Sequence, residues 1–306
     1  MKTISRWNMR VREVIVLISL TLGGSALAKD TVGLSISTLN NPFFVTLRDG
    51  AKAAADKAGL ELLVLDAQDK ADKQVSDIED LTQKKVKVIL VNPTDAAAVV
   101  PAIKRANAAK IPVITVDRAA SGGKVAYHIA SDNVAGGRLA GEFVCKLLGG
   151  KGKVAELEGI PGSSAARDRG KGFNDYLKSK CTGVKVVARQ TANFDRAQGL
   201  TVMENILQAQ PALDAVFAHN DEMALGALQA VKASKRPIKV VGFDATDDAV
   251  KAVDACEMAA TVAQQPKEMG RLSVEKAAEL AKGGKAPEKT EFIPVALKLV
   301  TNAKCK

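Results

Sequence analysis

The chain has 306 residues, of which 47% are hydrophobic, and it carries a formal net charge of +10 at pH 7. A balance this basic can indicate a nucleic-acid-binding protein. The basic residues are, however, scattered among acidic ones and form no run or stripe. This scatter favours an ordinary solvated surface, and we expect no nucleic-acid partner. Attraction to an anionic membrane face stays open as an alternative.

The first 28 residues have the pattern of a cleavable export signal. Four basic residues precede a short apolar run at 14–22, and Ala26-Leu27-Ala28 then fits a cleavage site. That run is too short to span a bilayer, and no later stretch approaches roughly 18 uninterrupted apolar residues. Cleavage before Lys29 removes the four basic residues and Glu13, so the net charge falls from +10 to +7. We therefore expect an exported, soluble protein without a membrane-spanning helix.

Beyond residue 28, strands and helices alternate almost without exception. The strands predicted in the first half are 31–36, 60–65, 86–91 and 112–116, with helices at 45–58, 71–84 and 96–109. A cap at Asp132-Asn133 opens the second half with a helix that extends to about residue 148. The strands that follow are 153–157, 184–189, 213–218, 238–243 and 258–264, with helices at 165–179, 196–209, 221–233 and 246–253. This alternation predicts parallel sheets covered on both faces.

Two such blocks of strands and helices predict two doubly wound α/β domains. A helix at 266–282 and an extended run at 291–300 remain after the second block. They must pack somewhere, and a return to the first domain is one solution. Several crossings between the domains would form a hinge and not a loose linker.

Four cysteines, Cys145, Cys181, Cys256 and Cys305, occur in a chain that we expect to reach an oxidising compartment. None has the spacing of metal ligands, and the chain has only two histidines, so zinc is disfavoured and no cofactor is expected. Three disulfide pairings are possible in principle, and unpaired thiols are the alternative.

The stretch 37–44 places two adjacent aromatic residues, Phe43 and Phe44, at a strand-to-helix turn beside Ser37 and Asn41. Only 4% of the chain is aromatic, so this placement needs a reason. One interpretation is a hydrophobic plug beneath the first helix. The other is a flat apolar wall for a ligand, with Ser37 and Asn41 supplying hydrogen bonds.

Polar or aromatic side chains also follow nearly all of the remaining predicted strands. In open α/β sheets, ligands bind beyond the carboxyl ends of the strands, so these side chains are candidates for a site. Helix caps alone would favour Ser and Thr and would not require Arg or Phe. The candidates are Asn92, Asp117, Arg118, Arg167, Asp168, Arg169, Phe194, Asn220, Asp221, Glu222, Asp244 and Gln264.

This mixture of side chains suits a sugar. Carboxylates, amides and guanidinium groups can each hold two neighbouring hydroxyls, and aromatic rings stack on the C–H faces of a sugar ring. The P-loop and dinucleotide-binding glycine motifs do not occur in the sequence. We expect His128 to be structural and His219 to line or support the site.

Catalysis finds little support in the sequence. The motifs G-x-S-x-G and H-E-x-x-H do not occur. Asp117 and Asp244 could flank a bond for hydrolysis, but Arg118 and Arg169 would hold both carboxylates ionised. A secreted sugar-processing enzyme is therefore the weaker hypothesis.

Several stretches, in order along the whole mature chain, resemble the ribose-binding members of the bacterial periplasmic sugar-binding protein family. The resemblance implies a type I periplasmic binding protein fold, in which two doubly wound parallel-sheet domains are joined by a three-segment hinge. The stretches are 37–44 (STLNNPFF), 92–95 (NPTD), 112–118 (PVITVDR), 128–133 (HIASDN), 164–169 (SAARDR), 193–196 (NFDR), 220–227 (NDEMALGA), 241–244 (VGFD) and 263–264 (AQ).

The resemblance also implies a role for each site residue. Phe43, Phe44 and Phe194 would sandwich a pyranose ring. Asn41, Asp117, Arg118, Arg169, Asn220, Asp244 and Gln264 would bond its hydroxyls, with Ser37 and Asn92 in or next to this set. The pattern favours D-ribose over allose, xylose, galactose or a furanosyl signal molecule. His219 stands where the family pattern has Gln, which could change affinity or preference modestly.

The family's chain crosses between its domains three times, which corresponds to 131–132, 264–265 and 293–294 here. One lobe would comprise 29–131 with 265–293, and the other 132–264 with 294–306. The resemblance further implies disulfides between Cys256 and Cys305 and between Cys145 and Cys181.

Family membership implies the substrate-binding component of an ABC sugar importer in the periplasm. Such a monomer closes around its sugar and then docks on a membrane permease or, in some members, on a chemoreceptor. A ligand-responsive transcription regulator shares the two-lobed fold, but it would carry an N-terminal helix-turn-helix where this chain has an export signal.

Overall fold

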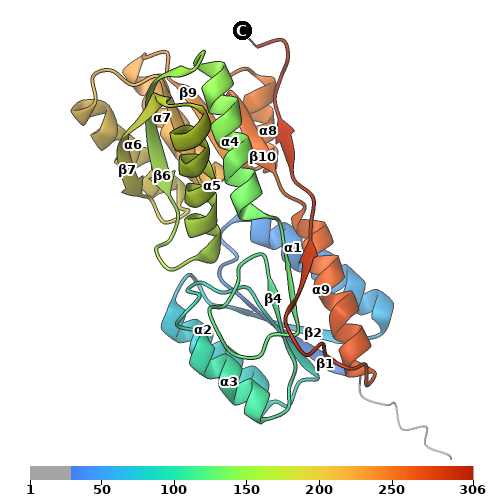
Figure 1. The fold of residues 1–306 in the computed structure, drawn as a ribbon. Coiled ribbons are helices and arrows are strands. Elements are labelled where there is room, and N and C mark those ends of the chain that lie inside the picture. The colour runs from blue at the N-terminus through green and yellow to red at the C-terminus, as the bar shows by residue number, and fades with distance from the viewer. Residues whose placement is uncertain (1–28, 306) are drawn as a thin grey trace, which may run out of the picture.

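The computed structural model describes residues 29–305, so the predicted export signal lies outside the described residues. Within them, no helix is long and apolar enough to cross a membrane. The strands form two separate six-stranded sheets, each with helices packed on its faces (Figure 1). The predicted α/β fold of two doubly wound domains is confirmed.

The first sheet has the strand order β11-β5-β4-β3-β1-β2, and all its strands pair in parallel. We call this sheet and its helices the N-terminal lobe. Its strands are β1 (Thr31–Ile36), β2 (Glu61–Asp66), β3 (Val88–Val91), β4 (Val113–Val116), β5 (Tyr127–Ala130) and β11 (Glu291–Pro294). Its helices are α1 (Pro42–Ala58), α2 (Ala71–Gln83), α3 (Val100–Ala108) and α9 (Pro266–Ala281).

The second sheet has the strand order β12-β10-β9-β8-β6-β7, in which only β12 is antiparallel to its neighbour. We call this sheet and its helices the C-terminal lobe. Its strands are β6 (Lys151–Glu158), β7 (Gly183–Thr191), β8 (Ala215–Ala218), β9 (Lys239–Asp244), β10 (Ala260–Ala263) and β12 (Lys298–Val300). Its helices are α4 (Asn133–Leu147), α5 (Ser164–Lys180), α6 (Arg196–Ala209), α7 (Asp221–Ser234) and α8 (Asp247–Asp254).

The chain passes between the two sheets three times, after β5, after β10 and after β11. The last passage is the extended C-terminal run, drawn in red in Figure 1, which links one lobe to the other. The leftover helix and the first part of the predicted tail strand therefore return to the N-terminal lobe. The predicted run 291–300 is divided into two strands, one in each sheet.

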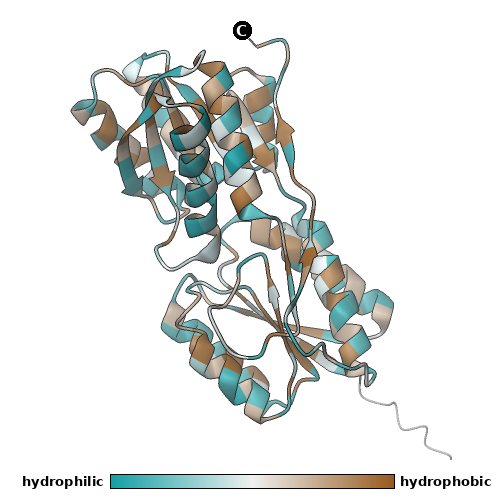
Figure 2. Cartoon of the chain, in the orientation of Figure 1, coloured by the Kyte–Doolittle hydropathy of each residue, from teal (hydrophilic) through white to brown (hydrophobic). Residues whose placement is uncertain are grey.

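Alternating burial explains why the strands lie between two helical layers. In β3, Val88 and Leu90 pack into the core shared with α1 and α9. Ile89 and Val91 of the same strand pack into the core shared with α2 and α3. Because both faces are covered, the strand is a continuous apolar run, as in other parallel sheets. Figure 2 shows the strands largely brown, while the helices carry hydrophilic residues as well.

Helices α4 and α5 are in backbone contact, and this contact determines where α5 lies. A Cβ atom at Gly137 of α4 would lie 2.0 Å from the carbonyl oxygen of Arg169 on α5. A Cβ atom at Gly172 of α5 would lie 2.0 Å from the carbonyl oxygen of Val134 on α4. Only glycine permits this approach, so the two helices hold each other in one register.

Several elements differ from the sequence prediction, and α3, for example, begins at Val100 and not at 96. Helix α1 begins at Pro42 and not at 45, because Oδ1 of Asn41 accepts a hydrogen bond from the backbone N–H of Phe43 at 2.9 Å and Pro42 occupies the first turn. Strand β5 was not predicted, because the polar His128 interrupts its short apolar run.

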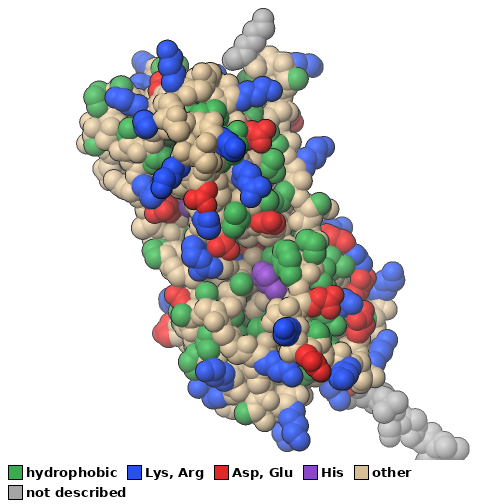
Figure 3. All heavy atoms as spheres, viewed as in Figure 1, with side chains coloured by type: hydrophobic (Ala, Val, Ile, Leu, Met, Phe, Trp, Pro, Cys, Tyr) green, Lys and Arg blue, Asp and Glu red, His purple; other side chains and the backbone are tan. Residues whose placement is uncertain are grey.

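Charged side chains are mixed over the visible surface. On the face shown in Figure 3, Lys and Arg side chains are spread over both lobes, with Asp and Glu side chains among them. This distribution agrees with the solvated surface expected from the sequence.

Both disulfides implied by the resemblance are present. Cys145 pairs with Cys181, joining the C-terminal ends of α4 and α5, and Cys256 pairs with Cys305, joining the loop after α8 to the C-terminal tail. All four cysteines are paired, and both bonds lie within the C-terminal lobe.

We expect the disulfides to stabilise the C-terminal lobe by restricting its unfolded chain. Replacing Cys145 and Cys181 by serine should lower the free energy of unfolding by about 2–4 kcal/mol, as measured by urea denaturation. A reducing agent should lower the urea midpoint of the wild-type protein but not that of a variant with all four cysteines replaced. Free thiols in the denatured, unreduced wild-type protein would contradict the pairing.

Candidate ligand-binding site

A buried cavity lies between the lobes, beyond the carboxyl ends of the strands. It is narrow, and the space open to the centre of a water molecule is only about 10 Å³. The lining residues from the N-terminal lobe are Asn41, Phe43, Phe44, Asp117 and Arg118. Those from the C-terminal lobe are Ala165, Arg169, Phe194, Asn220, Asp244 and Gln264. The structure thus brings together every side chain assigned to the site from the sequence except Ser37 and Asn92.

Ser37 and Asn92 lie beneath the cavity, where they hold Asp117. The hydroxyl of Ser37 donates to Oδ1 of Asn92 at 2.7 Å. Nδ2 of Asn92 in turn donates to the carbonyl of Val116 at 3.0 Å and to Oδ2 of Asp117 at 3.3 Å. These two residues therefore orient a cavity carboxylate and do not line the cavity themselves.

Several lining residues adopt backbone conformations that are unusual outside glycine. The φ angle is 61° at Asp117, 60° at Phe194 and 119° at Asp244. Such conformations cost of order 1–3 kcal/mol each and persist only where the surrounding structure enforces them. Here they turn the side chain that follows β4, the last side chain of β9 and one that precedes α6 toward the cavity.

Arg118 spans the boundary between the lobes. Its guanidinium carbon lies 5.0 Å from the ring centre of Phe44 in its own lobe and 5.0 Å from that of Phe194 in the other lobe. Its Nε lies 3.7 Å from Oδ2 of Asp117. Phe43 and Phe44 meet edge to face, with ring centres 5.2 Å apart, and both also belong to the core under α1. The two rings therefore form the predicted plug, and they also line the cavity.

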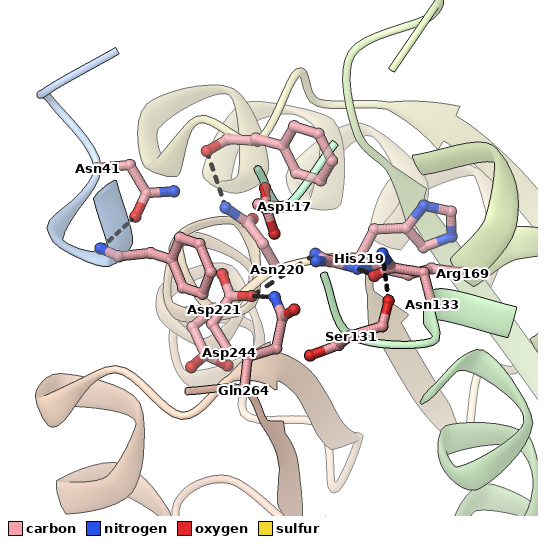
Figure 4. A network of polar contacts seen from close by, with 12 residues as sticks. Asn41, Asp117, Ser131, Asn133, Arg169, His219, Asn220, Asp221, Asp244 and Gln264 are labelled. Atoms are coloured by element: carbon pink, nitrogen blue, oxygen red, sulfur yellow. Dashed lines mark hydrogen bonds and ion pairs between the residues drawn. The ribbon is translucent and has the colours of Figure 1, made fainter. Parts of the chain in front are cut away.

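Arg169 enters the cavity from α5 and is held on several sides (Figure 4). Its Nε donates to Oδ1 of Asn133 at 2.8 Å, and its Nη1 donates to the carbonyl of His219 at 2.6 Å. Nη1 also lies 3.6 Å from Oδ1 of Asp244, and the guanidinium carbon lies 3.9 Å from the ring centre of Phe243.

The carboxylates of the cavity are strongly desolvated. Burial raises the pKa of Asp117, although Arg118 and Arg169 act in the opposite direction. Burial also raises the pKa of Asp244 to about 7, against the effect of Arg169 and of the hydrogen bond that Gln264 donates to it at 2.8 Å. The pKa of Arg118 is lowered, again chiefly by burial.

Asp221 supports Asp244 from behind. It is fully buried, accepts from the hydroxyl of Thr261 at 2.7 Å and accepts from the backbone N–H of Thr246 at 2.8 Å. Burial and the neighbouring Asp244 raise its pKa well above the ordinary value. The sequence placed Asp221 at a strand end but could not separate this buried role from a helix cap.

Other candidates from the sequence lie elsewhere. Arg167 and Asp168 pair with each other at 3.2 Å near the surface, outside the cavity. His128 lies on β5, where Nδ1 is 3.0 Å from the hydroxyl of Thr115 and the ring stacks on Phe292. The imidazole of His219 is fully buried behind the cavity, and only its carbonyl reaches a lining residue.

Several buried polar atoms in the cavity have no hydrogen-bond partner among residues 29–305. They are Oδ1 of Asp117, Nε and Nη1 of Arg118, and Oε1 of Gln264. Buried polar groups are normally hydrogen-bonded, so these donors and acceptors are matched to a polar ligand. The aromatic rings beside them match apolar faces. A small polyhydroxylated ring combines both properties.

Residues 32–285 match the periplasmic binding protein domain family. The chain belongs to this family. It is 51% identical to the ribose import binding protein of Haemophilus influenzae, covering 94% of this chain and 96% of that protein. It is also 51% identical to the ribose import binding protein of Escherichia coli, covering 93% and 95%. A Caulobacter myo-inositol binding protein, solved with myo-inositol bound, is 36% identical and superposes with a TM-score of 0.85, covering 90% and 94% of the two chains.

The lobes of this periplasmic binding protein are closed on each other. The backbone N–H of Ala119 donates to the hydroxyl of Ser164 at 2.8 Å, and that of Ala96 donates to the carbonyl of Gly162 at 3.1 Å. The polar and aromatic lining residues are all buried. A ligand can therefore reach the cavity only when the lobes separate.

The raised carboxyl pKa values predict that unliganded closure is favoured by acid. Asp244 and Asp117 bind a proton more tightly in the closed form than in an open, hydrated cleft, so lowering the pH shifts the equilibrium toward closure. The closed-to-open ratio should rise by up to about tenfold per pH unit for each proton taken up. The radius of gyration of ligand-free protein, measured by X-ray scattering, should fall between pH 8 and pH 6.

The variant Asp244→Asn provides the control, because its amide mimics the protonated carboxyl. It should be more closed than the wild type at pH 8 and respond less to pH. A radius of gyration that is constant, or that grows on acidification, would contradict the argument.

Proposed function

We propose that this protein binds D-ribose in the interlobe cavity and delivers it to an ABC permease. The observation that carries the proposal is the pairing, in one buried cavity, of aromatic rings with carboxylate, amide and guanidinium groups, of which several atoms lack hydrogen-bond partners among the described residues. Relatives about half identical over nearly their whole length are named ribose import binding proteins, which supports ribose as the ligand.

Under this proposal the lining residues divide into two groups. Phe43, Phe44 and Phe194 pack on the faces of the pyranose ring. The hydroxyls are bonded by Asn41, Asp117, Arg118, Arg169, Asn220, Asp244 and Gln264. Carboxylates accept hydrogen bonds from the sugar hydroxyls, and guanidinium groups donate hydrogen bonds to the hydroxyl oxygens. The cavity can therefore bond both the hydrogens and the oxygens of neighbouring hydroxyls.

Binding is coupled to closure about the hinge. Ribose contacts both lobes only in the closed form, so it has a higher affinity for that form and shifts the population toward it. The hinge segments are those at 131–132, 264–265 and 293–294. The closed protein acts as a monomer in the periplasm. In this form it docks on the permease and, where one exists, on a chemoreceptor.

The protein is a binder and not a hydrolase in this proposal. Asp117 and Asp244 contact the sugar through hydrogen bonds and take no part in bond cleavage. Incubation with candidate sugars followed by product analysis should return them unchanged. The specific rival is another small ring polyol, since a relative at 36% identity was solved with myo-inositol bound.

We expect calorimetric titration with D-ribose to give tight binding of one sugar per chain. The protein should be purified through unfolding, so that no sugar is carried over. Allose, xylose, galactose and myo-inositol should each bind at least about tenfold more weakly, a difference of 1.4 kcal/mol. No heat with ribose and a saturable response to another ligand would overturn ribose as the ligand and leave the binding role intact.

Arg169→Ala and Asp117→Ala should each cost at least about 2 kcal/mol of ribose binding, because each leaves a buried polar partner without its bond. Arg105→Ala and Asp49→Ala are matched controls, since both residues form ion pairs at the surface away from the cavity. The controls should bind like the wild type. Wild-type affinity in either cavity variant would refute the role assigned to that residue.

A further inference from the structure

The position of Arg169 depends on groups that do not line the cavity. Asn133 accepts from its Nε, and the backbone carbonyl of His219 accepts from its Nη1 at 2.6 Å. Figure 4 shows the imidazole ring of His219 extending away from Asp117 and Asn220. The position of the guanidinium group therefore depends on the position of the His219 backbone carbonyl.

That backbone is fixed in turn by the imidazole of His219. Nε2 of the ring is 2.9 Å from Oε1 of Glu156, and both side chains are fully buried. Because an ionised carboxylate can only accept, Nε2 carries the hydrogen and donates it. The next residue, Asn220, lines the cavity and caps α7 by accepting from the backbone N–H of Met223 at 3.0 Å. One buried side chain thus holds two cavity residues.

Glu156 is surrounded by donors that keep it ionised. Besides His219, it accepts from Nδ2 of Asn174 at 3.0 Å and from Nε of Arg189 at 2.8 Å. Burial alone would raise the pKa of Glu156, but the bonds from His219, Asn174 and Arg189 together lower it. The removal of the imidazole would leave a buried anion short of one donor, which is costly.

Helix α5 is shaped to receive this pair directly beside Arg169. A Cβ atom at Gly170 would lie 3.1 Å from Cε1 of His219 and 3.3 Å from Oε1 of Glu156. The absence of a side chain at Gly170 therefore lets the helix backbone approach the pair. Residue 170 thus packs against the Glu156–His219 pair, and residue 169, directly before it, carries the guanidinium group that enters the cavity.

We infer that His219, bonded to Glu156, is a positioning residue that sets Arg169 and Asn220 for ligand binding before the lobes close. Asn133, Glu156, Arg169 and His219 all belong to the C-terminal lobe, so their bonds persist when the lobes separate. A half-site held in its binding geometry loses less conformational entropy when the ligand arrives. The inference rests on the proposed function only for the choice of ribose as probe.

The test compares the ribose affinity and melting temperature of His219→Ala, His219→Gln and Met203→Ala with those of the wild type. Met203 is fully buried in the core of the same lobe and does not line the cavity, so its truncation controls for a general loss of stability. His219→Ala should weaken ribose binding by at least about tenfold. His219→Gln can donate an amide hydrogen to Glu156 and should bind within about threefold of the wild type. Met203→Ala should melt at a lower temperature and keep its affinity.

A second readout needs no ligand. In the unliganded protein, the Nε–H proton signal of Arg169 should be sharp and slow to exchange in the wild type, His219→Gln and Met203→Ala. It should broaden and exchange faster in His219→Ala. Should His219→Ala fail to fold, Glu156→Gln, which keeps the size of the side chain and removes its charge, should weaken binding and perturb the Arg169 signal in the same direction.

The outcomes separate the inference from the proposed ligand. An unchanged Arg169 signal in His219→Ala, with an affinity equal to that of Met203→Ala, would overturn the positioning role. The other outcome is that the wild-type protein does not bind ribose and the Arg169 signal still changes in His219→Ala. This would overturn ribose as the ligand and support the positioning role.

Discussion

The desolvation of charged groups between the lobes is the constraint on which the rest of the structure depends. Closure takes Asp117, Arg118, Arg169 and Asp244 out of water, and burial is the largest cause of the shifted pKa values of Asp117, Arg118 and Asp244. Removal of a charge from water is costly unless hydrogen bonds replace those to the solvent. A ligand that supplies those bonds stabilises the closed form and not the open form. Closure depends on the ligand because, without it, the free energy of desolvating these charges is not offset.

This constraint explains why a second layer of buried polar residues surrounds the cavity. Asn92 holds Asp117, Asp221 holds the turn after Asp244, and Asn133 holds Arg169. Asp117 and Asp244 have positive φ angles, which a non-glycine residue keeps only when its surroundings enforce them. The binding geometry is thus enforced by the folded lobes, and the ligand meets side chains that are already oriented.

Much of the cavity could be predicted from the sequence because parallel strands bring their carboxyl ends to one edge of a sheet. Asp117, Arg118 and Asp244 follow strands whose apolar runs are unambiguous, so their meeting required no knowledge of the tertiary packing. Asn133 and Glu156 could not be found in this way. Asn133 lies in the first turn of α4, and the packing of α5 against α4 brings it to Arg169. Glu156 lies within β6, and the pairing of β6 with β8 brings it to His219, which follows β8. Strand β5 was missed for a simpler reason, since the polar His128 interrupts its short apolar run.

The stability of the C-terminal lobe and the geometry of its half of the cavity rest on the same pair of helices. At one end of the pair, Gly137 of α4 touches the carbonyl of Arg169 on α5, beside the cavity. At the other end, the disulfide between Cys145 and Cys181 joins the two helices. A helix fixed at both ends can neither slide nor tilt far against its neighbour, so Arg169 keeps its position relative to Asn133 on α4. The disulfide that restricts the unfolded chain thereby also restrains, from the far end of the helix, the arginine that reaches into the cavity.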